Sequence, residues 1–128
     1  MTKYCSLSKF GIVDNKTKLE PEDDAATVNW GGNWRMPTIE EFEELLDSEY
    51  TNSCLINKNN VKGYLIVSKK NGNTIFLPAA GYRNDSSLYS AGLIGYYWSS
   101  SLYSGYPGSA RYVYFGSSGV DWVNDYRC

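Results

Sequence analysis

The chain has 128 residues, the size of one domain, and we expect a single domain over residues 1–128. Its 12 basic and 14 acidic residues give a formal charge of -2. This balance provides neither the basic surface that binds nucleic acid nor a polybasic membrane patch. The chain has no long apolar run and no signal-type segment after Met1, so we expect a soluble protein without membrane insertion.

The cysteines argue against metal and thiol chemistry. Histidine is absent, and Cys5, Cys54 and Cys128 have no Cys-x-x-Cys spacing, so we expect no metal site and no cofactor. Because domain termini often lie close together, Cys5 and Cys128 are candidates for a disulfide. The alternative, three reduced thiols, stays open.

A first helix is predicted over residues 21–30. Pro21 suits a first turn, three acids follow it where the helix dipole favours them, and Gly31-Gly32 ends the pattern. The alternative for this acidic region is a calcium cluster, which would use Asp14, Glu20, Glu22, Asp23 and Asp24. It lacks alternating loop ligands and an EF-hand glycine, so helix capping is favoured.

A second helix is predicted over residues 39–48. Thr38 and Glu41 have the spacing of a capping box. The apolar residues Ile39, Phe42, Leu45 and Leu46 then recur at helical spacing. We interpret its glutamates as the solvated face of this helix.

Strand signals begin after residue 61. Residues 63–68 and 74–77 flank Asn71-Gly72, which predicts an antiparallel hairpin. Shorter signals follow at 95–100, 110–115 and 120–122. They are separated by long polar loops near 83–94 and 101–109, a length that favours a functional role.

The last 48 residues, Gly81 to Cys128, contain 26 Gly, Ser or Tyr and no Lys or Glu. Antibody paratopes favour the same residue types, because Tyr supplies a large amphipathic contact at low entropic cost. This composition predicts a recognition surface. Strand alternation places Trp98 in the core, whereas the loop residues Tyr89, Tyr103 and Tyr106 are predicted to be exposed.

Catalysis is the weaker interpretation of this region. Asp85, Asp121 and Asp125 are its best acid/base candidates, and they would have to converge in one pocket. Loop aspartates more often bind turn backbones, so we expect that the protein is not an enzyme.

Several motifs in order resemble the bacterial "major paralogous" (Fibrobacter-type) surface domain, which has a C-type lectin-like fold. They are Val28-Asn-Trp-Gly-Gly-Asn-Trp-Arg-Met-Pro-Thr38, Glu40-Glu-Phe-Glu-Glu-Leu45, Asn71-Gly-Asn-Thr-Ile-Phe-Leu-Pro-Ala-Ala-Gly-Tyr-Arg83 and Gly95-Tyr-Tyr-Trp-Ser-Ser100. The resemblance implies an α+β fold with two helices flanking a twisted antiparallel sheet and long irregular loops. Residues 1–80 would form the scaffold, with the helices and the hairpin, and residues 81–128 the ligand-binding region. Within that region, the resemblance implies that Tyr97, Trp98, Val113 and Phe115 belong to the sheet and core.

Some domains of this type are variable proteins of diversity-generating retroelements, and the loops of this chain look similar. By position, the resemblance implies as ligand-binding residues Asn84, Asp85, Leu88, Tyr89, Ser90, Ile94, Tyr96, Tyr103, Ser104, Tyr106, Ser109, Arg111, Tyr112, Asp121, Trp122, Asn124 and Asp125, with Leu93, Ser117 and Ser118 as further candidates. The implied partner is a protein or glycan on a cell or phage surface, and the implied location is extracellular, at the cell surface or on a virion.

The chain also departs from this family. We expect both terminal strands of this family to be missing, which would leave a sheet edge able to recruit another chain. The Glu-Pro-Asn type triplet of calcium-dependent sugar-binding lectins is absent, and Trp122-Val-Asn-Asp125 only approximates its companion motif. The cysteine context of the related formylglycine-generating enzymes is also unmatched. The alternatives to ligand binding are a structural module of a larger bacterial surface protein and, as the weaker one, a lectin-fold enzyme.

Overall fold

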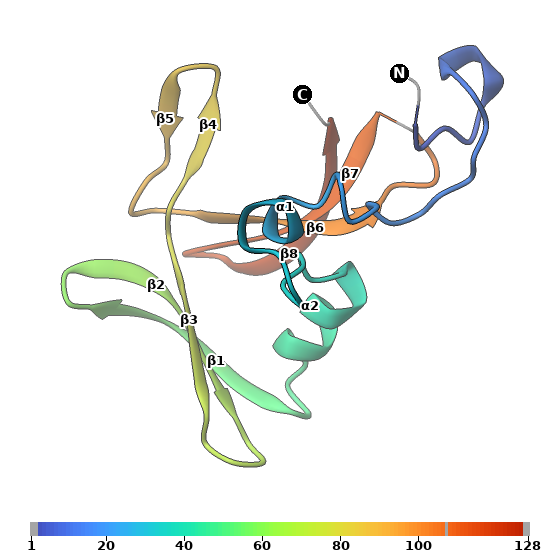
Figure 1. Ribbon diagram of the computed structural model, residues 1–128. Coiled ribbons are helices and arrows are strands. Elements are labelled where there is room, and N and C mark those ends of the chain that lie inside the picture. The colour runs from blue at the N-terminus through green and yellow to red at the C-terminus, as the bar shows by residue number, and fades with distance from the viewer. Residues whose placement is uncertain (1–2, 107, 127–128) are drawn as a thin grey trace. The chain divides into compact units, whose positions relative to one another are not determined.

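The computed structural model describes residues 3–106 and 108–126, without the side chains at 122 and 124–126. It is a small α+β fold with more strand than helix (Figure 1). The helices are a short 3₁₀ helix, η1 (Ser8–Phe10), and two α-helices, α1 (Ala25–Trp30) and α2 (Ile39–Leu46). The strands are β1 (Thr51–Lys58), β2 (Val61–Ser68), β3 (Thr74–Pro78), β4 (Tyr82–Asn84), β5 (Ser87–Tyr89), β6 (Gly95–Leu102), β7 (Ser109–Gly116) and β8 (Gly119–Tyr126).

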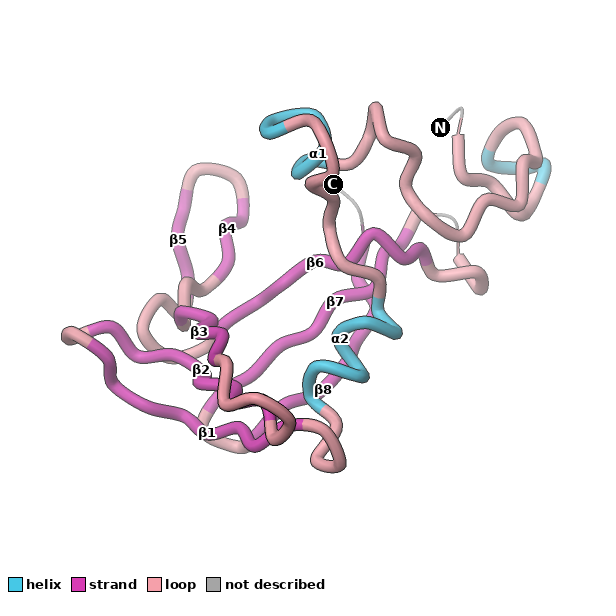
Figure 2. The backbone as a smooth tube through the Cα atoms, turned by 60° about the horizontal axis from the view of Figure 1, so that its bottom comes forward, coloured by secondary structure: helices cyan, strands magenta, loops and turns pink. Residues whose placement is uncertain are grey.

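The strands form three antiparallel sheets, in the orders β1-β2-β3, β4-β5 and β6-β7-β8 (Figure 2). The sequence predicted one twisted sheet, so this part of the expectation is wrong for the described residues. The short hairpin β4-β5 lies where a long polar loop was predicted at 83–94. Residues 119–126 form β8, of which the sequence predicted only residues 120–122 as strand. Asn84 in β4 and Asp121, Asn124 and Asp125 in β8 concealed these strands, because Asn and Asp are depleted in strands.

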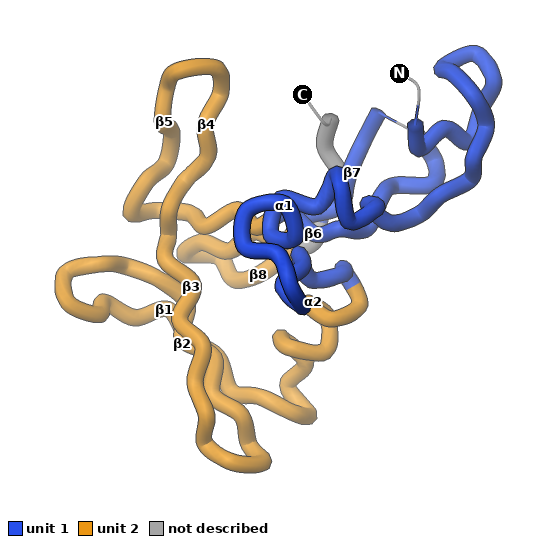
Figure 3. Tube along the Cα trace, viewed as in Figure 1, with its two compact units in different colours: residues 1–39, 98–112, 123–128 blue, residues 40–97, 113–122 orange. Residues whose placement is uncertain are grey.

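The chain divides into two compact units that alternate along the sequence (Figure 3). Unit 1 contains residues 1–39, 98–112 and 123–128, and unit 2 contains residues 40–97 and 113–122. Among the described residues, no helix is long and apolar enough to cross a bilayer.

In unit 1, α1 begins later than predicted. Asp24 is its N-cap, and the Asp24 carboxylate accepts hydrogen bonds from the backbone N–H groups of Ala26 and Thr27. Residues 21–23 form a turn before it, in which the Asp23 and Asp24 N–H groups bond the Glu20 carbonyl. Because Asp24 is the N-cap, the turn ends and α1 begins directly after it. A small apolar cluster of Tyr4, Leu102 and Ala110, with Leu19 against it, forms part of the core of this unit.

In unit 2, the hairpin predicted at Asn71-Gly72 is confirmed. β2 and β3 pair antiparallel, and Gly72 has a φ of 73°. The sequence analysis missed β1, which joins β2 through a two-residue turn, Asn59-Asn60. Both asparagines have positive φ, as a type I′ turn requires, and asparagine tolerates this conformation.

The core of unit 2 is built around Phe115. Its ring stacks on Tyr64, with 5.1 Å between ring centroids, and on Tyr97 at 6.1 Å. Gly95 lies against the same ring. Val113 is also buried, so the predicted core positions Val113 and Phe115 are confirmed.

Helix α2 ends two residues before the predicted limit of 48. Phe42 is buried, whereas Glu40, Glu41 and Glu44 are exposed, which confirms the solvated face expected for the glutamates. The Ile39 N–H donates to the hydroxyl of Ser101, 3.0 Å away within unit 1.

Candidate functional site

Unit 2 contains four tyrosine rings in consecutive contact, which we call the tyrosine ladder. Tyr89 stacks on Tyr82 with 5.4 Å between ring centroids, Tyr82 meets Tyr96 edge to face at 5.1 Å, and Tyr96 stacks on Tyr114 at 5.8 Å. The four residues come from β5, β4, β6 and β7. Tyr82 is 42% exposed and Tyr89 is 45% exposed, so one end of the ladder faces solvent.

The β4-β5 hairpin positions this end of the ladder. Its register pairs Tyr82 with Tyr89. At the turn, Asp85 has a φ of 51° and the Arg83 guanidinium donates to the Ser86 carbonyl at 3.2 Å. Gly81 is required at the base, because its φ is 71° and a Cβ there would lie 2.1 Å from the Tyr89 carbonyl oxygen.

The β4-β5 hairpin and the loop after it expose apolar side chains and carry few charges. Leu88 and Leu93 are both largely exposed. Between residues 82 and 96, the charged side chains are those of Arg83 and Asp85. Exposed tyrosine with few charges nearby is typical of the central part of a protein-binding surface.

Of the ladder residues, only Tyr89 and Tyr96 were predicted from the sequence as ligand-binding residues. Tyr82 and Tyr114 were missed as members of the site. The signal for Tyr82 was present, because Asp85-Ser86 suits a turn and lies midway between Tyr82 and Tyr89. The partner of Tyr96 on β7 depends on strand pairing, which no local pattern specifies.

In unit 1, the predicted loop 101–109 is shortened to 103–108, because β6 continues to Leu102 and β7 starts at Ser109. Tyr103 and Tyr106 are exposed, as is Tyr89 in unit 2, and this prediction is confirmed for all three. The Tyr106 ring meets Phe10 edge to face at 5.2 Å.

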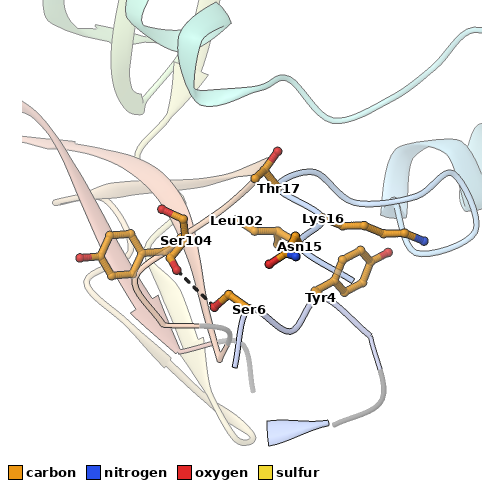
Figure 4. A pocket seen from close by; sticks show the side chains of 8 residues that line it. Tyr4, Ser6, Asn15, Lys16, Thr17, Leu102 and Ser104 are labelled. Atoms are coloured by element: carbon orange, nitrogen blue, oxygen red, sulfur yellow. Dashed lines mark hydrogen bonds between the residues drawn. The ribbon is translucent and has the colours of Figure 1, made fainter. Parts of the chain in front are cut away.

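A small pocket lies beside this loop (Figure 4). The Ser6 hydroxyl donates to the Ser104 carbonyl at 3.4 Å at its margin. Its lining residues are Tyr4, Ser6, Asn15, Lys16, Thr17, Leu102, Tyr103 and Ser104. Its volume is about 240 Å³, below the range of about 300–1,000 Å³ that is usual for ligand pockets.

Trp98 contradicts its predicted core position, since its side chain is 44% exposed. It packs edge to face on Tyr112, with 5.1 Å between ring centroids. The neighbouring small residue Ser99 is buried instead, and its hydroxyl donates to the Arg111 carbonyl at 2.7 Å. Burial does not alternate along this part of β6, because residues 99–102 are all buried.

The other predicted ligand-binding residues differ in exposure. Those exposed are Asn84, Asp85, Leu88, Leu93, Ser104, Ser117, Ser118 and Asp121, and those partly exposed are Ser90, Ile94, Tyr96 and Arg111. Ser109 and Tyr112 are buried, at 8% and 9% exposure, so a ligand would not contact them directly. The side chains of Trp122, Asn124 and Asp125 lie outside the described part of the structure.

The acidic region near residue 20 holds a lysine rather than an open cation site. The Lys3 ammonium contacts carboxylate oxygens of Asp23, Glu22 and Glu20 at 2.9, 3.0 and 3.5 Å. The Tyr4 hydroxyl donates to Asp23, and this bond and the bond from Lys3 lower the pKa of Asp23. Asp14 and Asp24 instead accept backbone N–H groups.

Of the remaining acid and thiol candidates, Asp85 lies at the turn between β4 and β5, and Asp121 lies in β8. Asp85 and Asp121 are exposed. Cys5 is buried, with its sulfur 3.6 Å from the Lys3 carbonyl oxygen, and Cys54 is exposed. The disulfide predicted between Cys5 and Cys128 involves a residue outside the described part of the chain.

Comparison with models of protein families, with the sequences of curated proteins and with solved structures finds no match for this chain.

Proposed function

We propose that this chain is a ligand-binding protein, of the receptor or adhesin kind, and that the tyrosine ladder is its principal contact surface. The observation that carries the proposal is the ladder itself. Four tyrosines from four strands hold one another in place, and the two on the β4-β5 hairpin are exposed. Rigid aromatic anchors of this kind lose little entropy when a partner binds.

A protein or a glycan on a cell or phage surface is the proposed ligand. The ladder offers ring faces and hydroxyl groups together, so it can cover an apolar patch and still hydrogen-bond at its rim. The loop with Tyr103 and Tyr106 in unit 1 is a second candidate contact region. We propose no catalytic role for either.

The proposed scaffold is the C-type lectin-like fold, and the proposed location is extracellular, at the cell surface or on a virion. The support is the ordered set of motifs from Val28 to Ser100 and the presence of two helices with antiparallel sheets. Retroelement diversification of the loops is part of this proposal. A reverse transcriptase gene and an adenine-rich template repeat beside the coding sequence would support it.

A binding screen followed by matched substitutions tests the ladder. The purified chain is screened on a glycan array and against a displayed library of surface proteins, and the affinity of each hit is measured by surface plasmon resonance. We expect Tyr82→Ala and Tyr89→Ala to weaken binding by about tenfold or more, because exposed tyrosines at the centre of an interface carry much of its binding energy.

Tyr50→Ala is the matched control, since Tyr50 is also exposed in unit 2 but lies before β1, outside the ladder. Binding that survives both ladder substitutions contradicts the assignment of the site. If binding then falls with Tyr103→Ala or Tyr106→Ala, the contact region is the loop in unit 1. If neither group matters, the alternative of a structural module in a larger surface protein is favoured.

A further inference from the structure

The outer side of β1 is an open sheet edge. Among the described residues, β1 pairs with β2 alone. In unit 1, by contrast, an extended segment covers the outer side of β6: the Leu19 N–H bonds the Ser100 carbonyl and the Leu102 N–H bonds the Thr17 carbonyl, both at 2.9 Å. An uncovered edge presents a row of backbone donors and acceptors that can pair with another strand.

Hydrogen bonds of β2 show which of its backbone groups face each neighbour. The Ala79 N–H donates to the Lys62 carbonyl and the Ser68 N–H donates to the Asn73 carbonyl, both at 2.8 Å. Even-numbered residues of β2 therefore bond on the β3 side. Since the bonding direction alternates along a strand, its odd-numbered residues bond on the β1 side.

The register then identifies the outward groups of β1. Lys58 pairs with Val61 across the two-residue turn, and Cys54 pairs with Leu65, so even-numbered residues of β1 bond to β2. The N–H and C=O groups of Ser53, Leu55 and Asn57 consequently point to the open edge.

This edge lacks the usual protections against pairing. Residues 51–57 contain no charge and no proline. The one charged residue of the strand, Lys58, lies beside the turn with its ammonium 5.6 Å from the centre of the Phe76 ring. Proteins commonly guard an edge with lysine, proline or a bulge. The outward backbone groups of β1 are therefore available for pairing with another strand.

We propose that β1 pairs antiparallel with β1 of a second copy of this chain, which joins two three-stranded sheets into one. A second copy fits because a strand that pairs with itself about a two-fold axis is always antiparallel, and an uncharged strand meets no like charge. The two strands can form hydrogen bonds only in registers that place outward-facing residues of one copy opposite outward-facing residues of the other. The one centred on Cys54 pairs residues 51–57 with each other and leaves Lys58 outside. The inference does not depend on the ligand-binding proposal, since β1 contains no ladder residue.

Sedimentation velocity of the full chain over a range of concentrations, under reducing conditions, tests the dimer. We expect a dimer that Ser53→Pro weakens by about tenfold or more, because each copy loses one outward N–H donor. Proline is tolerated on an edge strand when its nitrogen faces outward, so thermal unfolding should show a folded Ser53→Pro chain.

Ser53→Ala is the control, because it keeps the N–H group and should leave the dimer unchanged. A wild-type chain that stays monomeric at every concentration overturns the proposal. The partner of the β1 edge would then be an extended segment of a different protein. A dimer unaffected by Ser53→Pro, in a chain that remains folded, also overturns the proposal.

Cys54 tests the register. In the proposed pairing the two Cys54 residues face each other at a position without backbone hydrogen bonds, with Cβ atoms about 4.5–5.5 Å apart. Treatment of the dimer with diamide should therefore give a disulfide-linked pair, which Cys54→Ser abolishes and Ser53→Pro strongly reduces. A dimer that gives no such link contradicts the axis at Cys54.

Discussion

Asp24 illustrates how one buried carboxylate organises a segment of unit 1. It is 3% exposed, and it accepts backbone N–H groups from Ala26, Thr27 and Met36. Burial opposes its ionisation, but the N–H donors of Thr27, Met36 and Ala26 outweigh burial and lower its pKa. The same side chain therefore starts α1 and holds the chain that returns after Gly31-Gly32.

We expect Asp24→Ala to lower the free energy of unfolding by about 2–3 kcal/mol, because it removes the cap and leaves the Met36 N–H without its acceptor. Urea unfolding monitored by circular dichroism measures the loss. Asp24→Asn keeps one acceptor oxygen and should cost less. Equal stability of Asp24→Ala and the wild-type chain would contradict this role.

Gly95 is needed because Phe115 occupies the space where a side chain would lie. A Cβ at residue 95 would be 2.3 Å from Cζ of Phe115. The Phe115 ring is buried between Tyr64 and Tyr97, so it has little room to move. We expect Gly95→Ala to destabilise the protein by about 1–3 kcal/mol, as overpacking of a core does.

Gly116→Ala is the matched control for Gly95→Ala. Its nearest contacts to an added Cβ would be 3.6 and 3.8 Å, which is ordinary packing. Chemical denaturation of both variants should show a loss only for Gly95→Ala. A loss of the same size in both would mean that glycine flexibility in these strands, and not Phe115, is responsible.

At the scale of elements, the segment that begins at Lys3 is tied to the turn before α1 by charge. The pKa of Glu22 is lowered by a hydrogen bond from the backbone N–H of Glu22 itself and by the Lys3 ammonium. The pKa of Asp23 is lowered by the Tyr4 hydroxyl and by Lys3. A carboxyl whose pKa is lower in the folded state stabilises the fold above its unfolded pKa of about 4. This contribution is lost as the pH falls through the folded pKa.

We therefore expect the Tyr4 ring to lose its fixed environment in acid, below about pH 4, as Asp23 and Glu22 are protonated. An NMR titration of the Tyr4 ring signals measures the transition. Lys3→Gln should raise its midpoint, because the ammonium that favours the ionised carboxylates is gone. A midpoint unchanged by Lys3→Gln would show that Lys3 does not act on these groups.

Elements with local signals were predicted well. The hairpin at Asn71-Gly72 and the helix after Thr38 depend on neighbours in sequence, and both are present. β1 also had a signal, because Asn59-Asn60 can adopt the positive φ values of a tight turn, but the polar ends of the strand concealed it. Trp98 was misplaced because its burial depends on which face of β6 is covered, and alternation alone does not determine that.

At the scale of the whole chain, the residues rich in Tyr, Ser and Gly belong to both units. Residues of one composition therefore have different surroundings: Tyr82 and Tyr89 are exposed in the ladder, Tyr112 is buried under Trp98, and the Tyr97 hydroxyl donates to the Pro78 carbonyl at 2.7 Å. Composition indicated the recognition surface that we propose. It could not separate contact residues from core residues.

The sequence by itself determined the local features of this protein: the α+β class, the position of α2, the tight turn at Gly72 and the exposure of Tyr89, Tyr103 and Tyr106. Each depends on residues close together in the chain. Only the tertiary structure decided that Tyr82 and Tyr114 join the ladder, that Trp98 is exposed and that β1 has an open edge. These features depend on strand pairing between distant segments, which is set by long-range packing and not by local preference.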